Sequence, residues 1–284
     1  MKRGKKKMIF RIIAAIILIL AITAAICLYH FIGVSKCVGE KKYQYEMQEI
    51  HVTYDDIDLY GMALIPESDT EETFPTVIFA HGAESNYKSD MATLKSLAKS
   101  GVACYTFDFY GWTDRSTGPK GTHWFKDVPR GVDDSYEQKV LQQVEDLNAV
   151  IEKVKTFSFV DKEQLYLLGS SMGGATVAAT SVEHTEDISG IILQYPAINL
   201  VPGAMKDGDT YSVNRYENPV LLLQGTKDKI VPQSMSDALA EYYNKEDSNH
   251  CKYVIYEGQP HVFDGKNKVI AAEEIYQFIR ATSK

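Results

Sequence analysis

A serine flanked by glycines is the first group in this chain whose type and spacing could do chemistry. Residues 169–174 read Gly-Ser-Ser-Met-Gly-Gly, and the pattern G-x-S-x-G places Ser171, rather than Ser170, at its centre. Such a serine lies on a tight turn between a strand and a helix, which lifts its hydroxyl clear of the sheet. Residues 165–168 are predicted as a strand and residues 173–182 as a helix, so the required context is present. We interpret Ser171 as a candidate nucleophile and the Met172 backbone N–H as a candidate oxyanion donor.

A serine hydroxyl is a weak nucleophile until a base takes its proton. Asp228 lies just after the predicted strand at 220–223, and His261 lies just after the predicted strand at 253–256. The chain order Ser, Asp, His is the order that accompanies this kind of serine turn. Taken singly, Asp228 could be a turn or helix-capping residue and His261 a surface loop residue. Their joint order and placement favour His261 as the general base and Asp228 as the acid that orients it.

The segment His81-Gly82-Ala83-Glu84 follows a short apolar run that is predicted as a strand at 76–80. Acyl transfer at a serine needs a second N–H donor for the oxyanion, and a loop in this position supplies it. We assign this donor to the Ala83 backbone and expect His81 to brace the loop. Glu84 is a candidate acid for holding a substrate amine.

These candidates require a framework that brings distant loops together. The hydrophobic pattern predicts strands alternating with helices. Strands are expected at 48–54, 59–65, 76–80, 102–109, 165–168, 188–193, 220–223 and 253–256, and helices at 90–99, 134–155, 173–182, 234–243 and 269–279. Near-continuous apolar strands between helices indicate an α/β fold with a mostly parallel sheet covered on both faces. Ligands bind at the carboxyl ends of such strands, where every candidate residue lies.

The order HG, GxSxGG, Asp and His across residues 45–284 resembles the α/β-hydrolase superfamily. Within it, the chain is similar to bacterial esterases of the cinnamoyl-esterase and dienelactone-hydrolase type, and to prolyl-oligopeptidase-like and proline-iminopeptidase-like serine peptidases. The resemblance implies an α/β-hydrolase fold with a nucleophile, acid, base and two oxyanion donors. These roles fall on Ser171, Asp228, His261, Ala83 and Met172.

One departure from the family pattern concerns the substrate pocket. Cinnamoyl esterases carry a sizeable insertion where this chain has only residues 194–219, so the lid is expected to be short or absent. A long loop at 110–133 could shape the pocket instead. The aromatic pocket candidates are Tyr110, Trp112, Trp124 and Tyr195. The same side chains could alternatively pack the loop down onto the body.

The first thirty-four residues carry six basic side chains and no acidic one, and residues 12–29 form an apolar run. A membrane-spanning helix needs roughly 20 such residues. An excess of Lys and Arg before the span favours a cytoplasmic N-terminus. We therefore expect a basic cytoplasmic tip at 1–11, a signal-anchor helix at 12–34, a stalk at 35–44 and an extracytoplasmic domain at 45–284. A cleaved secretory signal, with a secreted domain, is the alternative.

Composition excludes several classes of protein. The chain has 284 residues, 45% of them hydrophobic, and a formal net charge of −8, which argues against a nucleic-acid partner. The seven histidines are scattered without the spacing of a metal site, so no metal and no cofactor are expected. Four cysteines, one of them in the apolar N-terminal run, leave little scope for disulfides, and we expect none.

Three functions fit these residues. The first is a carboxylic ester hydrolase that works through an acyl-serine intermediate on small-molecule esters. The second is a serine peptidase on the same fold, because ester and amide cleavage share the same machinery. The third is a catalytically inactive binding domain, since a fold alone does not give a function.

Overall fold

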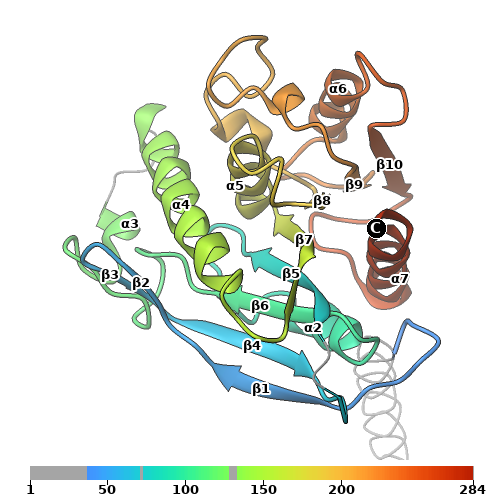
Figure 1. Ribbon diagram of the computed structural model, residues 1–284. Helices are drawn as coiled ribbons and strands as arrows, with labels where there is room; N and C mark the ends of the chain where they lie inside the picture. Colours follow the sequence, from blue (N-terminus) through green and yellow to red (C-terminus); the bar gives the residue numbers. More distant parts are fainter. Residues whose placement is uncertain (1–36, 71–72, 128–132, 284) are drawn as a thin grey trace, which may run out of the picture.

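An eight-stranded sheet lies at the centre of the computed structural model, which describes residues 37–70, 73–127 and 133–283 (Figure 1). The strand order is β1-β4-β6-β5-β7-β8-β9-β10. The strands are β1 (Tyr45–Glu49), β4 (Gly61–Pro66), β6 (Ala103–Phe107), β5 (Phe74–Ala80), β7 (Val160–Ser170), β8 (Gly190–Gln194), β9 (Val220–Gly225) and β10 (Cys251–Tyr256). β1 pairs antiparallel with β4, and β4 pairs antiparallel with β6. The pairings from β6 to β10 are parallel, so their carboxyl ends lie along one edge.

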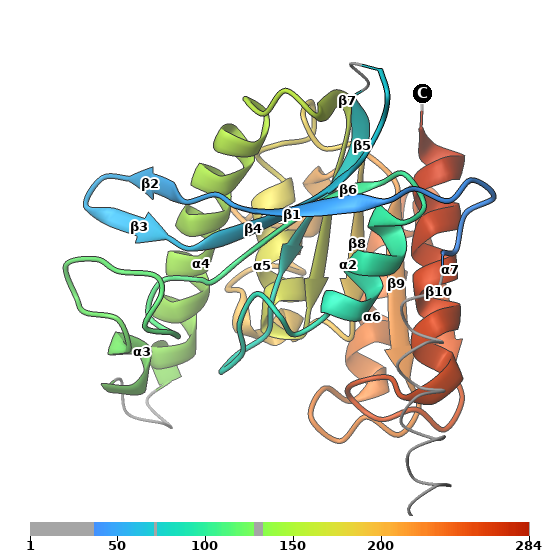
Figure 2. The same cartoon turned by 90° about the horizontal axis from the view of Figure 1, so that it is seen from below.

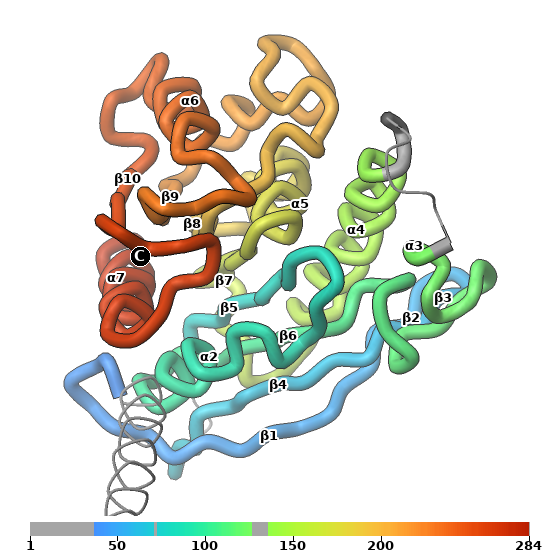
Figure 3. Tube along the Cα trace, turned by 180° about the vertical axis from the view of Figure 1, so that it is seen from behind, coloured from blue at the N-terminus to red at the C-terminus, as the bar shows by residue number. Residues whose placement is uncertain are grey.

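Helices cover both faces of this sheet, as the views in Figures 2 and 3 make clear. They are α2 (Met91–Ala98), α3 (Trp124–Asp127), α4 (Asp133–Val154), α5 (Met172–Ser181), α6 (Gln233–Tyr243) and α7 (Gly265–Thr282). Apolar residues of α4, α5 and α6 belong to one core cluster, and those of α2 and α7 belong to a second. Within β5, Ile78 enters the first cluster, whereas Val77 and Phe79 enter the second. This alternation is the period of a strand with both faces buried, and it confirms the predicted α/β fold.

The first two predicted strands, at 48–54 and 59–65, are each divided in the structure. β1 continues into β2 (Val52–Tyr54), which pairs with β3 (Ile57–Leu59) in a separate two-stranded sheet. The prediction of one continuous strand at 48–54 was therefore wrong, because the Ile50 carbonyl accepts the Tyr105 hydroxyl and the Tyr60 N–H donates to Ser116 Oγ, so that these groups are not paired across the two strands. Other predicted elements are present with shifted ends. The largest shift is that of β7, which begins at Val160 rather than at 165.

The expected stalk is packed against the domain in the part that the structure describes. The backbone N–H groups of Val38 and Gly39 donate to Ser100 Oγ at 2.9 and 3.0 Å. The Tyr43 N–H donates to the Lys99 carbonyl at 2.8 Å. Lys99 and Ser100 lie in the turn between α2 and β6, so the stalk lies at the amino ends of the parallel strands. This is the edge opposite the one where the candidate site residues lie.

The expected anchor helix at 12–34 falls outside the described residues. Among the helices of the described ranges, none has the length and hydropathy needed to cross a membrane. Cys37, Cys104 and Cys251 are free thiols, and Cys104 and Cys251 are buried. Burial raises the pKa of both buried thiols, which keeps them protonated and unreactive.

Candidate active site

The turn at Ser171 has the geometry that the sequence predicts. Ser171 has a φ of 55° and directly precedes α5, whose first residue is Met172. A non-glycine residue in this left-handed region is strained, and such strain persists only where the surrounding structure imposes it. A Cβ on Gly169 would collide with the Gly173 backbone, and one on Gly173 would collide with the Ala80 carbonyl. The two flanking glycines are therefore required by close backbone packing.

Asp228 and His261 form a hydrogen-bonded pair across the ends of β9 and β10. Asp228 Oδ2 accepts a hydrogen bond from His261 Nδ1 at 2.7 Å, and the Asp228 side chain is fully buried. The other carboxylate oxygen, Oδ1, accepts the backbone N–H groups of Ile230 and Val231 at 2.8 and 2.9 Å. Because Nδ1 donates to the carboxylate, Nε2 is left as the proton-accepting nitrogen of the neutral ring.

His81 joins the loop after β5 to the loop after β6. Its Nδ1 donates to the Gly82 carbonyl at 2.7 Å, and its Nε2 accepts the Phe109 N–H at 3.1 Å. The ring is fully buried, and burial lowers the pKa of His81, so the ring is neutral. Both ring nitrogens are engaged with backbone groups, which supports the expected bracing role.

One cavity of about 380 Å³ joins the predicted reactive groups. Ser171, His261 and Ala83 all line it, as do the pocket candidates Glu84 and Tyr195. The Tyr195 ring packs against the His261 ring, with centroids 4.6 Å apart. A Cβ added to Gly82 would lie 3.3 Å from Ser171 Cβ, so the β5 loop approaches the serine closely. Met172 is not among the residues that line the cavity; it begins α5 directly after Ser171, and its side chain is buried in the core.

Three aromatic pocket candidates lie elsewhere. Tyr110, Trp112 and Trp124 are buried in a core cluster and are not among the residues that line the cavity. The Trp112 and Trp124 rings both pack against Phe125, with centroids 4.8 and 4.1 Å apart. Their assignment to the pocket was therefore wrong, because the rings fill the space between the loop and α4. The alternative, that they pack the loop down, is what the structure shows.

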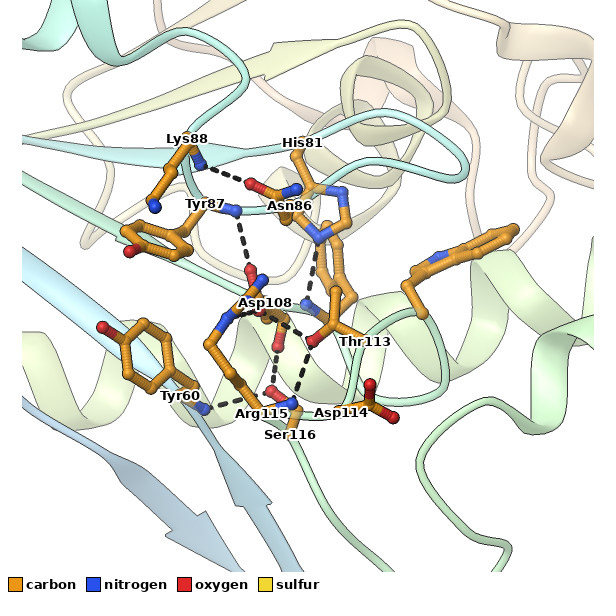
Figure 4. Close-up of polar contacts among 12 residues, drawn as sticks. Tyr60, His81, Asn86, Tyr87, Lys88, Asp108, Thr113, Asp114, Arg115 and Ser116 are labelled. Atoms are coloured by element: carbon orange, nitrogen blue, oxygen red, sulfur yellow. Dashed lines mark hydrogen bonds and ion pairs between the residues drawn. The ribbon is translucent and has the colours of Figure 1, made fainter.

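Asp108 holds the same loop closed. The Tyr87 N–H donates to its Oδ1 at 2.7 Å, and Thr113 Oγ1 and Arg115 Nε donate to its Oδ2 at 2.7 and 2.6 Å (Figure 4). Ser116 Oγ also donates to the Asp108 carbonyl at 2.6 Å. With its side chain fully buried and its carboxylate satisfied, Asp108 is a structural residue of this loop.

The segment expected to carry at most a short lid does not cover the cavity. Of residues 194–219, only Gln194 and Tyr195 line it. The rest of the segment includes two short 3-10 helices, Ile198–Leu200 and Val213–Arg215. Most of its apolar side chains belong to the core, whereas Met205 is exposed.

Several lining residues escaped the sequence analysis. Those outside the predicted set include Asp90, Thr93, Tyr136, Gln194, Ile230, Val262 and Lys268. Gln194 is the last residue of β8. It could have been predicted in the same way as Asp228, because ligands bind at the carboxyl ends of parallel strands. Asp90 and Lys268 stand at the starts of α2 and α7, and only the packing of these two helices brings them to the cavity.

One group of side chains in the described part of the chain has the spacing of metal ligands. It consists of Glu152, His184 and Asp187. The Lys155 ammonium already lies 3.2 Å from Glu152 and 2.8 Å from Asp187. A cationic side chain therefore supplies the charge that a metal would bring, and the group is read as an ion-pair cluster.

Comparison with known proteins agrees with this geometry. Residues 71–208 match the family model described as serine aminopeptidase, S33. YfhR of Salmonella typhimurium, an uncharacterized protein, is 28% identical over 194 residues, covering 60% of this chain and 59% of its own. The quorum-quenching protein AidA of Acinetobacter baumannii is 25% identical over 186 residues, covering 64% of this chain and 53% of its own. The matched region thus spans little more than half of these relatives.

Among solved structures, Est1E of Butyrivibrio proteoclasticus with bound ferulic acid superposes with a TM-score of 0.65 and 21% identity. The match covers 82% of this chain and 98% of that one. This likeness shows that the chain has the α/β-hydrolase fold, as the motif order predicted.

Proposed function

We propose that the protein is a carboxylic ester hydrolase that works through an acyl-serine intermediate. In this proposal Ser171 is the nucleophile, His261 the general base and Asp228 the acid that orients the imidazole. The observation that carries it is the 2.7 Å Asp228–His261 hydrogen bond, in a pair whose imidazole lines the same cavity as the strained Ser171 turn.

The chemistry follows from these positions. Ser171 Oγ attacks the ester carbonyl carbon while His261 Nε2 takes the hydroxyl proton, and Asp228 stabilises the resulting imidazolium. The carbonyl oxygen becomes an oxyanion that the backbone N–H groups of Ala83 and Met172 stabilise. Collapse of this intermediate expels the alcohol, which takes the proton from His261. A water molecule then attacks the acyl-serine by the same route and releases the acid.

The cavity suits a small or medium ester. Its volume is about 380 Å³, which is near the lower end of common ligand sites. Ile230 and Val262 are 70% and 53% exposed and lie among its lining residues, so part of the cavity wall is apolar and open to water. The structural neighbour Est1E, which was solved with ferulic acid, offers an example of an acid of this size.

A serine peptidase is the second candidate. Glu84 lines the cavity directly after the proposed oxyanion loop, with a strained φ of 55°, and a carboxylate there could hold a substrate amine. The matched family model, of serine aminopeptidases, also favours it. Glu84→Gln should reduce cleavage of amino-acid amides far more than cleavage of simple esters. Equal effects on both would exclude this role.

We further propose that residues 12–34 anchor the domain to the membrane with the N-terminus in the cytoplasm. The basic tip and apolar run support this orientation. Because the stalk docks at the amino ends of the strands, the cavity would face away from the bilayer. Intact-mass analysis of the membrane and medium fractions tests the anchor. An uncleaved chain in the membrane fraction is expected, whereas a chain that has lost its N-terminal segment and is found in the medium would show a secreted protein instead.

The enzymatic proposal has a direct test on the full-length protein. We expect p-nitrophenyl acetate and butyrate to be hydrolysed, and a fluorophosphonate probe to label Ser171. Ser171→Ala should lower kcat by at least about 1,000-fold and abolish labelling while the melting temperature stays close to that of the wild type. An absence of turnover and of labelling in the wild type would instead favour the inactive binding domain.

A further inference from the structure

The cavity that contains Ser171 also has a polar wall that the proposed ester cleavage does not use. Asp90 and Thr93 come from α2, Gln194 ends β8, and Lys268 comes from α7. All four residues line the same cavity as Ser171 and His261. A molecule bound for cleavage at Ser171 is therefore within the same enclosure as these groups.

Asp90 is unusual because its carboxylate is incompletely satisfied. It occupies the N-cap position of α2, yet its side chain makes no capping hydrogen bond to the helix. Oδ1 accepts the Thr93 hydroxyl at 2.8 Å, whereas Oδ2 is buried and has no hydrogen-bond partner. Leaving a buried carboxylate oxygen unpaired is costly, so a retained one indicates a partner that binds from outside the chain.

Gln194 supplies a donor beside this acceptor. Its Oε1 accepts the Ser170 hydroxyl at 2.7 Å, which commits the carbonyl side of the amide to the protein. The Nε2 group is then the side left to donate. Burial raises the pKa of Asp90 to about 6 against the opposing effect of the Thr93 hydroxyl, and the Lys268 cation and the Gln194 amide lie close enough to lower this pKa as well. Neither places a donor within hydrogen-bond distance of Oδ2.

We propose that Asp90 and Gln194 form a specificity subsite for a hydroxyl group on the substrate ester. The hydroxyl donates to Asp90 Oδ2 and accepts from Gln194 Nε2, which satisfies both groups at once. A hydroxyl fits better than an ammonium because the nearby Lys268 cation opposes a second positive charge. This inference rests on the proposed function, since it names the class of ester that the same cavity selects.

The test compares matched esters on the full-length protein. One pair carries a terminal hydroxyl on the acyl side, ethyl hydroxyhexanoate against ethyl hexanoate. The other pair carries it on the alcohol side, hydroxyhexyl acetate against hexyl acetate. For one pair, we expect kcat/KM of the hydroxylated member to exceed that of its analogue by roughly tenfold or more, because a site built to bind a hydroxyl rejects an analogue that lacks it. The pair that responds identifies which side of the ester reaches Asp90.

Asp90→Ala should bring this ratio close to one, and Asp90→Asn should retain part of the preference through its amide oxygen. Asp264→Asn is the matched control, because Asp264 is also an N-cap residue without a capping side-chain bond but does not line the cavity. It should leave the ratio unchanged. A wild-type ratio near one for both pairs, or a preference that survives Asp90→Ala, would overturn the subsite. So would a stronger preference for an amine in place of the hydroxyl.

Failure of the subsite is distinguishable from failure of the proposed function. If Ser171 is labelled and esters turn over without any hydroxyl preference, only the subsite is wrong. If nothing turns over, calorimetric binding of the same ester pairs to the Ser171→Ala variant gives the comparison without chemistry. Equal affinities for both members of each pair in that measurement would then exclude the subsite on its own.

Discussion

Two neighbouring strand ends of this sheet carry loops of opposite character. The loop after β5, residues 81–90, faces the cavity with Ala83, Glu84 and Asp90. The loop after β6, residues 108–123, is closed onto the core by Asp108 and by stacked aromatic rings. Both loops carry buried polar groups. The difference lies in hydrogen bonding, since Asp108 has side-chain or backbone donors on both carboxylate oxygens whereas one oxygen of Asp90 has none.

This comparison separates structural from functional polar residues by their unused hydrogen-bonding capacity. A buried group whose partners all come from the chain stabilises the fold, and that group has no hydrogen-bonding capacity left for a ligand. A buried group with unused hydrogen-bonding capacity either destabilises the fold or makes a contact with a bound ligand. Asp228 lies between these cases, because it is fully satisfied while holding His261, the residue that faces the cavity.

The strongest test of this comparison removes the Asp108 carboxylate. Asp108→Ala leaves the Tyr87 N–H and the Thr113 hydroxyl without their acceptor and the Arg115 guanidinium without its partner. We expect the free energy of unfolding to fall by about 3–5 kcal/mol. Urea denaturation of the full-length protein measures it. Asp114→Ala in the same loop is the control and should cost under about 0.5 kcal/mol, because that carboxylate is exposed. Comparable losses in both variants would contradict the structural role.

A second prediction concerns pH and the helix that supports the closed loop. Burial raises the pKa of Asp146 on α4 to about 7, although the Tyr54 hydroxyl and the Tyr110 N–H donate to it and lower its pKa. The folded protein therefore holds the proton of the Asp146 carboxyl more tightly than the unfolded chain does, where the pKa of this carboxyl is about 4. The protonated Asp146 carboxyl therefore contributes fully to the free energy of unfolding below pH 4. This contribution, of up to about 4 kcal/mol, is lost as the pH rises from 4 to 7.

Asp146→Asn tests this dependence because it removes the titrating group. The variant should lose less stability than the wild type between pH 4 and 7, as followed by thermal melts at fixed ionic strength. Asp90, whose pKa burial raises to about 6, contributes with the same sign and is present in both proteins. An identical pH slope in wild type and variant would show that Asp146 ionises normally in the fold.

The smallest expected effect on stability and activity comes from substituting an aromatic residue that the sequence predicted for the pocket. Trp112→Phe keeps a ring against Phe125 and removes a buried indole N–H that has no hydrogen-bond partner. We expect a change in unfolding free energy within about 1 kcal/mol and kcat/KM for p-nitrophenyl butyrate within about twofold of wild type. Tyr195→Ala, which removes a ring from the cavity wall, is the contrasting variant and should lower kcat/KM. A larger kinetic effect from Trp112 would return that residue to the substrate pocket.

Local sequence determined the parts of this molecule that depend on short-range backbone constraints. The glycines at 169 and 173 indicate a turn that only residues without a Cβ can form at such close packing, and Ser171 follows from them. Asp228 and His261 follow from the same logic, because parallel strands place all their carboxyl ends at one edge. The apolar periodicity similarly gave most strands and helices to within a few residues, and failed where Ile50 and Tyr60 interrupt a strand.

Only the tertiary structure decided which side chains reach the cavity. Trp112 and Trp124 have the size and polarity expected of pocket residues, yet packing against α4 buries them on the wrong side of the loop. Asp90 and Lys268 are separated by most of the domain in sequence, and they meet because α2 and α7 pack side by side on one face of the sheet (Figure 3). Whether a carboxylate oxygen is left unpaired depends on every neighbour at once, and no local pattern contains that information.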